Sequence, residues 1–202
     1  MRFLQKWLYK GEFEFLFEKP ESEEVVVIDT ETTGLDTKKD EIISIAAIKV
    51  RKNHILTSKS LYLEIAPKDG IKKESIKIHK LRSCDLKGAI EAKEALRRFL
   101  YFIKNRPLVG YYLEFDIKMI DRYLKEFFGL RLPNRQIEVS GIYHDYKQKA
   151  IPQGFIDLKF DTILNDLDIP KLKAHNAFND AIMTAMIYLK LKRRRYGKSS
   201  SF

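Results

Sequence analysis

The stretch Val25-Val-Val-Ile-Asp-Thr-Glu-Thr-Thr-Gly-Leu35 carries the strongest signals in this 202-residue chain. Its first four residues are a short β-branched run, which is typical of a buried strand. Asp29 and Glu31 follow directly, and side chains two residues apart on a strand point to the same face. We therefore expect both carboxylates to project from one spot at the end of this strand.

Two carboxylates in one place repel each other, so one must stay protonated unless a cation lies between them. Carboxylate oxygens that are open to water favour Mg²⁺ or Mn²⁺ over Zn²⁺. An Asp-x-Glu pair is nevertheless common and is usually just two solvated acids at the end of a strand. The pair suggests a divalent metal site only if other parts of the chain supply further ligands.

The rest of the chain predicts one α/β domain built on a mixed sheet. Two strands, at 42–50 and about 60–65, are joined by a turn at 52–53 and form an antiparallel meander with the first. Helices and strands then alternate, which places helices on both faces of the sheet. We expect helices at 89–103, 116–128, 155–167 and 176–195, and strands at 107–112 and 137–143.

Two further acidic positions fall at the same edge of the predicted sheet. Asp116 lies between the fourth strand and its helix, and His175-Asn-Ala-Phe-Asn-Asp180 opens the last helix. Each Asp alone could simply cap or open a helix. In an open α/β sheet, however, ligands bind at this edge. The candidate metal ligands are therefore Asp29, Glu31, Asp116 and Asp180, with His175 nearby.

Taken together, three motifs resemble a known family. Val27-Ile-Asp-Thr-Glu-Thr-Thr-Gly-Leu35, Val109-Gly…Phe-Asp116 and His175…Asp180-Ala are similar to the motifs of the DEDD exonucleases in their histidine-containing (DEDDh) branch. That branch includes the proofreading subunit of bacterial replicative DNA polymerase. The resemblance covers roughly residues 24 to 191. It implies a ribonuclease H-like fold, two Mg²⁺ or Mn²⁺ ions, and a 3′–5′ exonuclease that releases nucleoside 5′-monophosphates.

The resemblance also implies roles for single residues. Asp29, Glu31 and Asp180 would hold the ion that carries the attacking water, and His175 would take a proton from that water. Asp29 would also reach the second ion, whose site Asp116 completes. These residues form the catalytic set that the resemblance predicts.

Substrate contacts are implied in the same way. Thr30, Thr32 and Thr33 would hold the terminal nucleotide, and His79 and Phe115 would contact its sugar or base. One departure stands out, because Tyr111-Tyr112 occupies a place where many family members have His-Asn. The grip on the substrate, and with it the preference for DNA or RNA, is therefore left open.

The resemblance favours the 3′ end of DNA, preferably single-stranded or frayed, as the substrate. An exoribonuclease that trims RNA 3′ ends is an alternative, because the catalytic residues do not distinguish a 2′-hydroxyl. A non-catalytic nucleic-acid-binding or polymerase-docking module is another alternative. It is disfavoured because every position of the catalytic set is filled.

Composition fits a protein that binds nucleic acid. Lys and Arg number 38 against 28 Asp and Glu, a net charge of +10, and such an excess attracts polyanions. The basic residues after Lys190 either contact phosphates or form a solvated helix end. One cysteine, Cys84, excludes an internal disulfide and a Cys-rich zinc site. No apolar run is long enough to span a bilayer, so we expect a cytoplasmic protein without a membrane partner.

The chain divides into residues 1–20, an N-terminal helical extension, and residues 21–202, an exonuclease domain with a basic C-terminal tail. Helical spacing of apolar residues predicts a helix in the first half of the extension, which Gly11 ends. The extension packs on the domain, docks a polymerase or other protein partner, or lies on a membrane surface.

Overall fold

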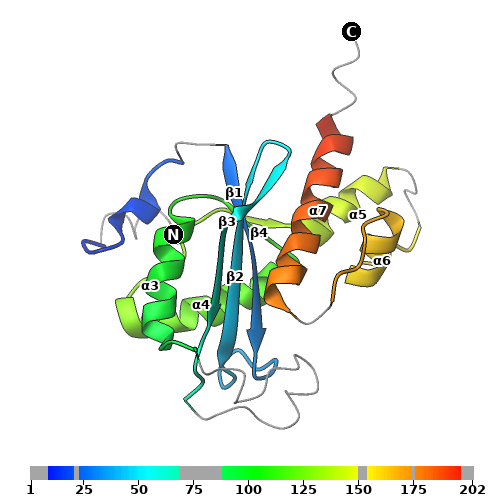
Figure 1. The fold of residues 1–202 in the computed structure, drawn as a ribbon. Coiled ribbons are helices and arrows are strands. Elements are labelled where there is room, and N and C mark those ends of the chain that lie inside the picture. Colours follow the sequence, from blue (N-terminus) through cyan, green and yellow to red (C-terminus); the bar gives the residue numbers. More distant parts are fainter. Residues whose placement is uncertain (1–8, 21–22, 69–87, 150–153, 174–175, 197–202) are drawn as a thin grey trace.

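The computed structural model describes residues 9–20, 23–68, 88–149, 154–173 and 176–196, and side chains of the last helix as far as residue 193. A five-stranded sheet stands at the centre, and helices cover both of its faces (Figure 1). This arrangement confirms the predicted α/β class.

The sheet is mixed, with the strand order β3-β2-β1-β4-β5. β1 (Glu24–Thr32) pairs antiparallel with β2 (Ile42–Arg51), and β2 pairs antiparallel with β3 (His54–Glu64). On the other side, β4 (Leu108–Gly110) runs parallel to β1, and β5 (Gln136–Glu138) runs parallel to β4. The predicted antiparallel meander of the first three strands is confirmed.

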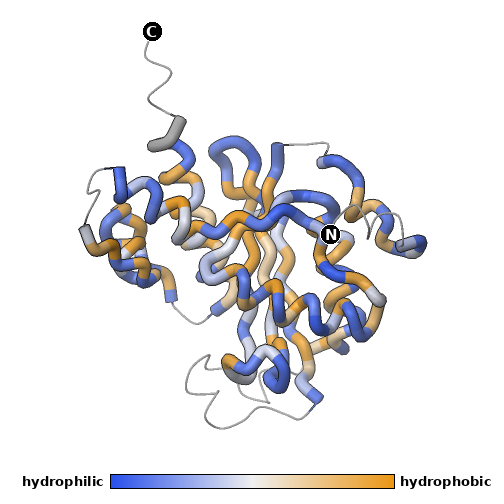
Figure 2. The backbone as a smooth tube through the Cα atoms, turned by 180° about the vertical axis from the view of Figure 1, so that it is seen from behind, coloured by the Kyte–Doolittle hydropathy of each residue, from blue (hydrophilic) through white to orange (hydrophobic). Residues whose placement is uncertain are grey.

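β1 is buried on both faces, which explains its unbroken run of apolar residues. Val26 and Ile28 pack into one hydrophobic cluster, while Val25 and Val27 pack into another on the opposite face. Strands near the centre of Figure 2 accordingly show hydrophobic colours, and the turns show hydrophilic ones. The first cluster lies under α3 (Ala92–Ile103) and α4 (Leu113–Phe128); the second lies under α5 (Val139–Gln148), α6 (Phe160–Asp166) and α7 (Ala177–Tyr196).

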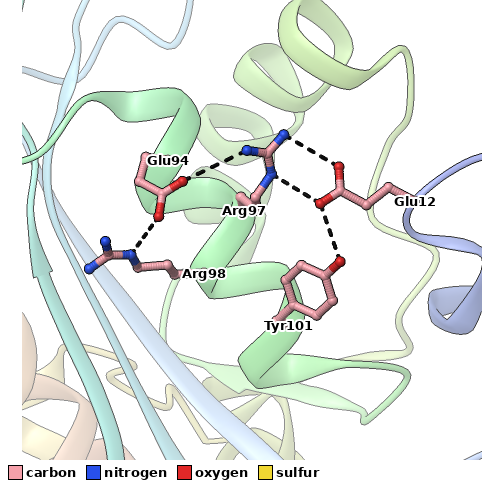
Figure 3. Close-up of polar contacts among 5 residues, drawn as sticks. All are labelled: Glu12, Glu94, Arg97, Arg98 and Tyr101. Atoms are coloured by element: carbon pink, nitrogen blue, oxygen red, sulfur yellow. Dashed lines mark hydrogen bonds and ion pairs between the residues drawn. The ribbon is translucent and has the colours of Figure 1, made fainter.

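The described part of the N-terminal extension packs on α3 and α4 (Figure 1). It holds a 3₁₀ helix, η1 (Glu14–Phe17), and the Phe13 ring is buried 4.9 Å from the ring of Phe128. Glu12 forms an ion pair with Arg97 at 3.0 Å and accepts a hydrogen bond from the Tyr101 hydroxyl at 3.2 Å (Figure 3). Because this pair is partly exposed, the buried rings contribute more than the charges do.

Most of the helix expected before Gly11 falls on residues 1–8, which lie outside the described residues. The boundary at residue 20 stays a prediction, as does a partner for this segment.

The fifth strand expected at 137–143 is present but much shorter than expected. Only Gln136–Glu138 is extended, and α5 begins at Val139. The Glu138 side chain accepts a hydrogen bond from the backbone N–H of Ser140 at 3.0 Å and so caps the helix. Val139 and Tyr143 are both buried, and their spacing of four is helical as well as compatible with a strand.

Other boundaries shift by a few residues. The helix expected from 155 begins at Phe160, and the third strand begins at His54 rather than near Ser60. The helix expected from 116 begins at Leu113, so Asp116 lies in its first turn instead of at the N-cap. In the part of the chain that the structure describes, no helix combines the length and apolar character needed to cross a membrane.

Candidate active site

The end of β1 brings three acidic side chains together. Val25 and Val27 pack on the face that α7 covers, so Asp29 and Glu31 continue that face by strand alternation. Asn176 precedes α7, its side chain accepts a hydrogen bond from Asn179 N at 3.1 Å, and Asp180 follows in the first turn. Carboxylate oxygens of Asp29, Glu31 and Asp180 lie within 4.8 Å of one another.

Asp116 joins this cluster from the other face of the sheet. Thr30 points toward α4, and Asp116 Oδ1 accepts hydrogen bonds from Thr30 N at 3.1 Å and Thr30 Oγ1 at 2.5 Å. Asp116 is only 4% exposed, and its charge raises the pKa of Asp29. The residue between the two β1 carboxylates therefore positions the fourth one.

Glu138 fixes the first turn of α4, where Asp116 lies. Its carboxylate accepts hydrogen bonds from Leu113 N at 2.8 Å and from both the backbone N–H and the hydroxyl of Ser140. It thereby ties the start of α4 to the start of α5. The role of Glu138 was not predicted from the sequence, where the available signal was an acid placed two residues before Ser140, as in a helix cap.

Burial and mutual repulsion shape the electrostatics of the cluster. The pKa of Asp29 is raised well above its ordinary value by burial, then by the charges of Asp116, Asp180 and Glu31. Burial and the charges of Asp180 and Asp116 raise the pKa of Glu31 to about 7. Burial also raises the pKa of Asp116 to about 7, although the hydrogen bonds from Thr30 lower it. Protons thus stay on the cluster near neutral pH when no cation compensates the charge.

This donor set fits a divalent cation. Three half-buried carboxylates can each offer an oxygen from within 4.8 Å of the others, and a cation would relieve the repulsion that raises the pKa values of Asp29 and Glu31. Oxygen-only ligands suit Mg²⁺ or Mn²⁺. The residues that could hold such an ion are Asp29, Glu31 and Asp180, with Asp116 beside them.

A closed loop, residues 33–41, follows the acidic end of β1. Thr33 N donates a hydrogen bond to Glu41 O at 2.8 Å, and Glu41 N donates to Thr33 Oγ1 at 2.9 Å. The Thr33 hydroxyl in turn donates to Asp40 Oδ1 at 3.2 Å. Arg122 on α4 donates to the carbonyl oxygens of Thr37 and Asp40. The contacts of Arg122 with this loop were not predicted, because nothing in the local sequence signals contacts across 82 or more residues.

The structure describes four of the five predicted substrate-binding residues. The Thr32 hydroxyl donates to Gly34 O at 2.7 Å, so Thr30, Thr32 and Thr33 all form hydrogen bonds within the protein. Phe115 is partly buried against the cluster beneath α3 and α4. His79 and His175 lie outside the described residues, as does Cys84.

Comparison with known proteins shows the family. The profile of the exonuclease family matches residues 26–188. The chain belongs to the exonuclease family. DNA polymerase III subunit epsilon of Aquifex aeolicus is 31% identical over 166 residues, which cover 82% of this chain and 79% of that protein. A PolC-type DNA polymerase III of Caldanaerobacter subterraneus subsp. tengcongensis is 30% identical, with 83% of this chain matching only 11% of that protein.

Solved structures show the same fold. Cell-death related nuclease 4 (CRN-4) superposes with a TM-score of 0.72 at 13% identity, over 86% of this chain and 64% of that one. E. coli exonuclease I bound to a dT13 oligonucleotide also gives 0.72, at 16% identity, over 88% of this chain and 42% of that one. This exonuclease therefore has a ribonuclease H-like fold and spans less than two thirds of these neighbours. The predicted family, fold and enzyme class, a 3′–5′ exonuclease, are confirmed.

The first prediction concerns how the stability of the metal-free protein changes with pH. A carboxyl group whose pKa is raised on folding stabilises the folded state while protonated, and this contribution is lost as the pH rises through the folded-state pKa. The melting temperature measured in chelator should therefore fall between about pH 4.5 and about pH 8. Asp29→Asn removes one repelling charge, so it should flatten this slope and raise the melting temperature at the upper end.

Added Mg²⁺ should stabilise the wild type at the upper pH and stabilise Asp29→Asn much less. If Asp29→Asn were no more stable than the wild type in chelator at about pH 8, the carboxylates would not be repelling one another.

The second prediction concerns Gly34 in the loop. A Cβ at this position would lie 2.5 Å from Asp40 Oδ2, and Asp40 is buried and bonded to Thr33 and Asp36. Gly34→Ala should therefore lower the free energy of unfolding by about 1–3 kcal/mol in urea titrations. Gly141→Ala is the matched control, because its Cβ meets nothing within 4 Å and lies inside α5. The control should be neutral or stabilising; equal destabilisation by both would contradict the packing at Gly34.

Proposed function

We propose that this exonuclease removes nucleotides from the 3′ end of single-stranded or frayed DNA and releases nucleoside 5′-monophosphates. The observation that carries the proposal is the cluster at the end of β1. Oxygens of Asp29, Glu31 and Asp180 lie within 4.8 Å of one another, and Asp116 is held beside them by Thr30. A site of four acids suits a reaction on a phosphodiester only if cations offset its charge.

In the proposed site these four carboxylates hold two Mg²⁺ or Mn²⁺ ions. Bound ions of this kind lower the pKa of water and offset negative charge on the attacking and departing oxygens. The chain itself fixes the carboxylates, through the alternation of β1, the hydrogen bonds of Thr30 to Asp116, and the first turn of α7. His175, five residues before Asp180, is proposed from the family resemblance to accept the proton of the attacking water.

The terminal nucleotide is proposed to contact Thr30, Thr32, Thr33 and Phe115, and also His79. Backbone groups near the threonines are the more suitable contacts, because the three hydroxyls already form hydrogen bonds within the protein. The main-chain N–H of Thr30 is also engaged, by Asp116. Backbone contacts and a partly buried ring read no sequence, which suits an enzyme that trims any 3′ end.

The relatives and structural neighbours of this chain favour DNA over RNA as its substrate. Its relatives include proteins named DNA polymerase III subunit epsilon, and the exonuclease I structures that resemble it hold dT13 or dA16 oligonucleotides. The relatives also support a polymerase as protein partner, and we propose that the N-terminal segment contributes to that contact. The complete acidic cluster argues against a non-catalytic module.

The experiment uses end-labelled single-stranded and duplex oligonucleotides, of DNA and of RNA, with Mg²⁺ or with excess chelator. Single-stranded DNA should be shortened from its 3′ end only, with nucleoside 5′-monophosphates as the product resolved by chromatography. A 3′-blocked strand should be spared. Cleavage in chelator, or a clear preference for RNA, would overturn the proposal.

Asp180→Asn tests the acidic cluster in the same assay. The amide keeps the shape but loses a charge that holds cations, so turnover should fall by at least about 100-fold. Asp161→Asn is the matched control, because Asp161 also lies in the first turn of a helix and is exposed. It should retain wild-type turnover. More than a tenth of wild-type activity in Asp180→Asn would exclude Asp180 as a metal ligand.

A further inference from the structure

Tyr112 is a large aromatic side chain that is exposed to solvent at the start of α4, four residues before Asp116. It is 71% exposed, and it precedes α4, whose first turn contains Asp116. Its ring meets the Tyr111 ring edge to face, with the centroids 5.5 Å apart. Tyr111 is itself fixed, since its hydroxyl donates to Leu158 O at 3.0 Å and its ring lies 4.7 Å from that of Phe160. The Tyr112 ring is thus exposed to solvent but packed against the fixed ring of Tyr111.

The backbone of Tyr112 adopts a conformation that does not suit a bulky side chain. Its φ of 55° and ψ of 32° lie in the left-handed region, which Gly and Asn enter far more readily. The exposed ring recovers little of this cost through burial. Strain of this kind beside a functional site points to a role in binding.

The surroundings of Tyr112 favour a nucleobase over a phosphate. A pocket of about 340 Å³ adjoins the ring at the ends of β4 and β5. Two of its lining residues, Glu114 and Glu138, are acidic, and Glu114 pairs with Lys118 at 2.6 Å. Carboxylates repel the phosphate backbone, whereas a neutral base can lie flat on a tyrosine ring.

We propose that Tyr112 is a stacking platform for one base of the bound strand, beside the metal-binding carboxylates. The proposal deepens the proposed function and rests on it, because a nucleic-acid strand must pass this edge of the sheet. Stacking is tolerant of base identity, so the platform adds affinity without reading sequence. It also gives the Tyr111-Tyr112 pair a role: Tyr111 supports the ring, and Tyr112 offers its free face to the substrate.

The test compares Tyr112→Asn and Tyr112→Phe with the wild type, on single-stranded DNA and RNA oligonucleotides in parallel. Asn suits the left-handed backbone, so Tyr112→Asn should melt at a higher temperature than the wild type. Its KM should nevertheless rise by between about 5-fold and about 150-fold, the usual worth of one stacked base. Tyr112→Phe keeps the ring and should stay within about twofold of the wild-type KM. The rise in melting temperature on adding Mg²⁺ should be the same in all three proteins.

A scan of oligonucleotides, each with one abasic position counted from the 3′ end, locates the contact. In the wild type one position should weaken binding about as much as Tyr112→Asn does, and in Tyr112→Asn that position should cost little more. An unchanged KM in Tyr112→Asn, or losses that add at every abasic position, would overturn the inference. Wild-type activity on RNA alone would overturn the DNA proposal and leave Tyr112 to be judged on RNA. Wild-type protein inactive on both would overturn both proposals.

Discussion

Repulsion among carboxylates at the end of β1 is the constraint on which the rest of the site depends. The charges of Asp116 and Asp180 raise the pKa values of Asp29 and Glu31, and burial raises them further. Carboxylate oxygens of Asp29, Glu31 and Asp180 lie within 4.8 Å of one another. Such a cluster persists only because the surrounding fold is stable enough to hold it. The buried central strand supplies that stability, since β1 packs against helices on both faces. Cations that relieved this repulsion would link metal binding to the stability of the folded chain.

Successive side chains of β1 point to opposite faces of the sheet, so this one strand contacts the helices on both faces. Asp29 and Glu31 point toward α7, which contributes Asp180, while Thr30 between them points toward α4 and holds Asp116. The acids therefore meet although they lie up to 151 residues apart in sequence, from Asp29 to Asp180. Supporting contacts keep the helices in place: Glu138 fixes the start of α4, and Arg122 anchors the loop after β1. The positions of Asp116 and Asp180 thus depend on where α4 and α7 begin.

Local patterns predicted much of this arrangement, and long-range contacts account for what they missed. The β-branched run at Val25 and the Asp-x-Glu after it identified the central strand and its acids, because both signals depend on neighbours in sequence. The strand expected at 137–143 ends at Glu138 because Val139 and Tyr143 fit a helical face equally well, and the Glu138 cap favours the helix from Val139 on. The contact of Glu138 with Leu113 and that of Arg122 with Thr37 could not be predicted, since these partners lie 25 or more residues away. The left-handed backbone at Tyr112 was equally hidden, because tyrosine is not a residue that signals it.

The most direct measurement is a calorimetric titration of Mn²⁺ into the exonuclease with a hydrolysis-resistant single-stranded oligonucleotide bound. Because the cluster is proposed to hold two ions, saturable binding of two equivalents per chain is predicted for the wild type and for the control Asp161→Asn. Asp116→Asn should retain one equivalent, and Asp29→Asn, which alters both sites, should bind weakly or not at all. An absence of saturable binding in the wild type, or an isotherm unchanged by Asp29→Asn, would contradict the claim that these carboxylates form a cation site.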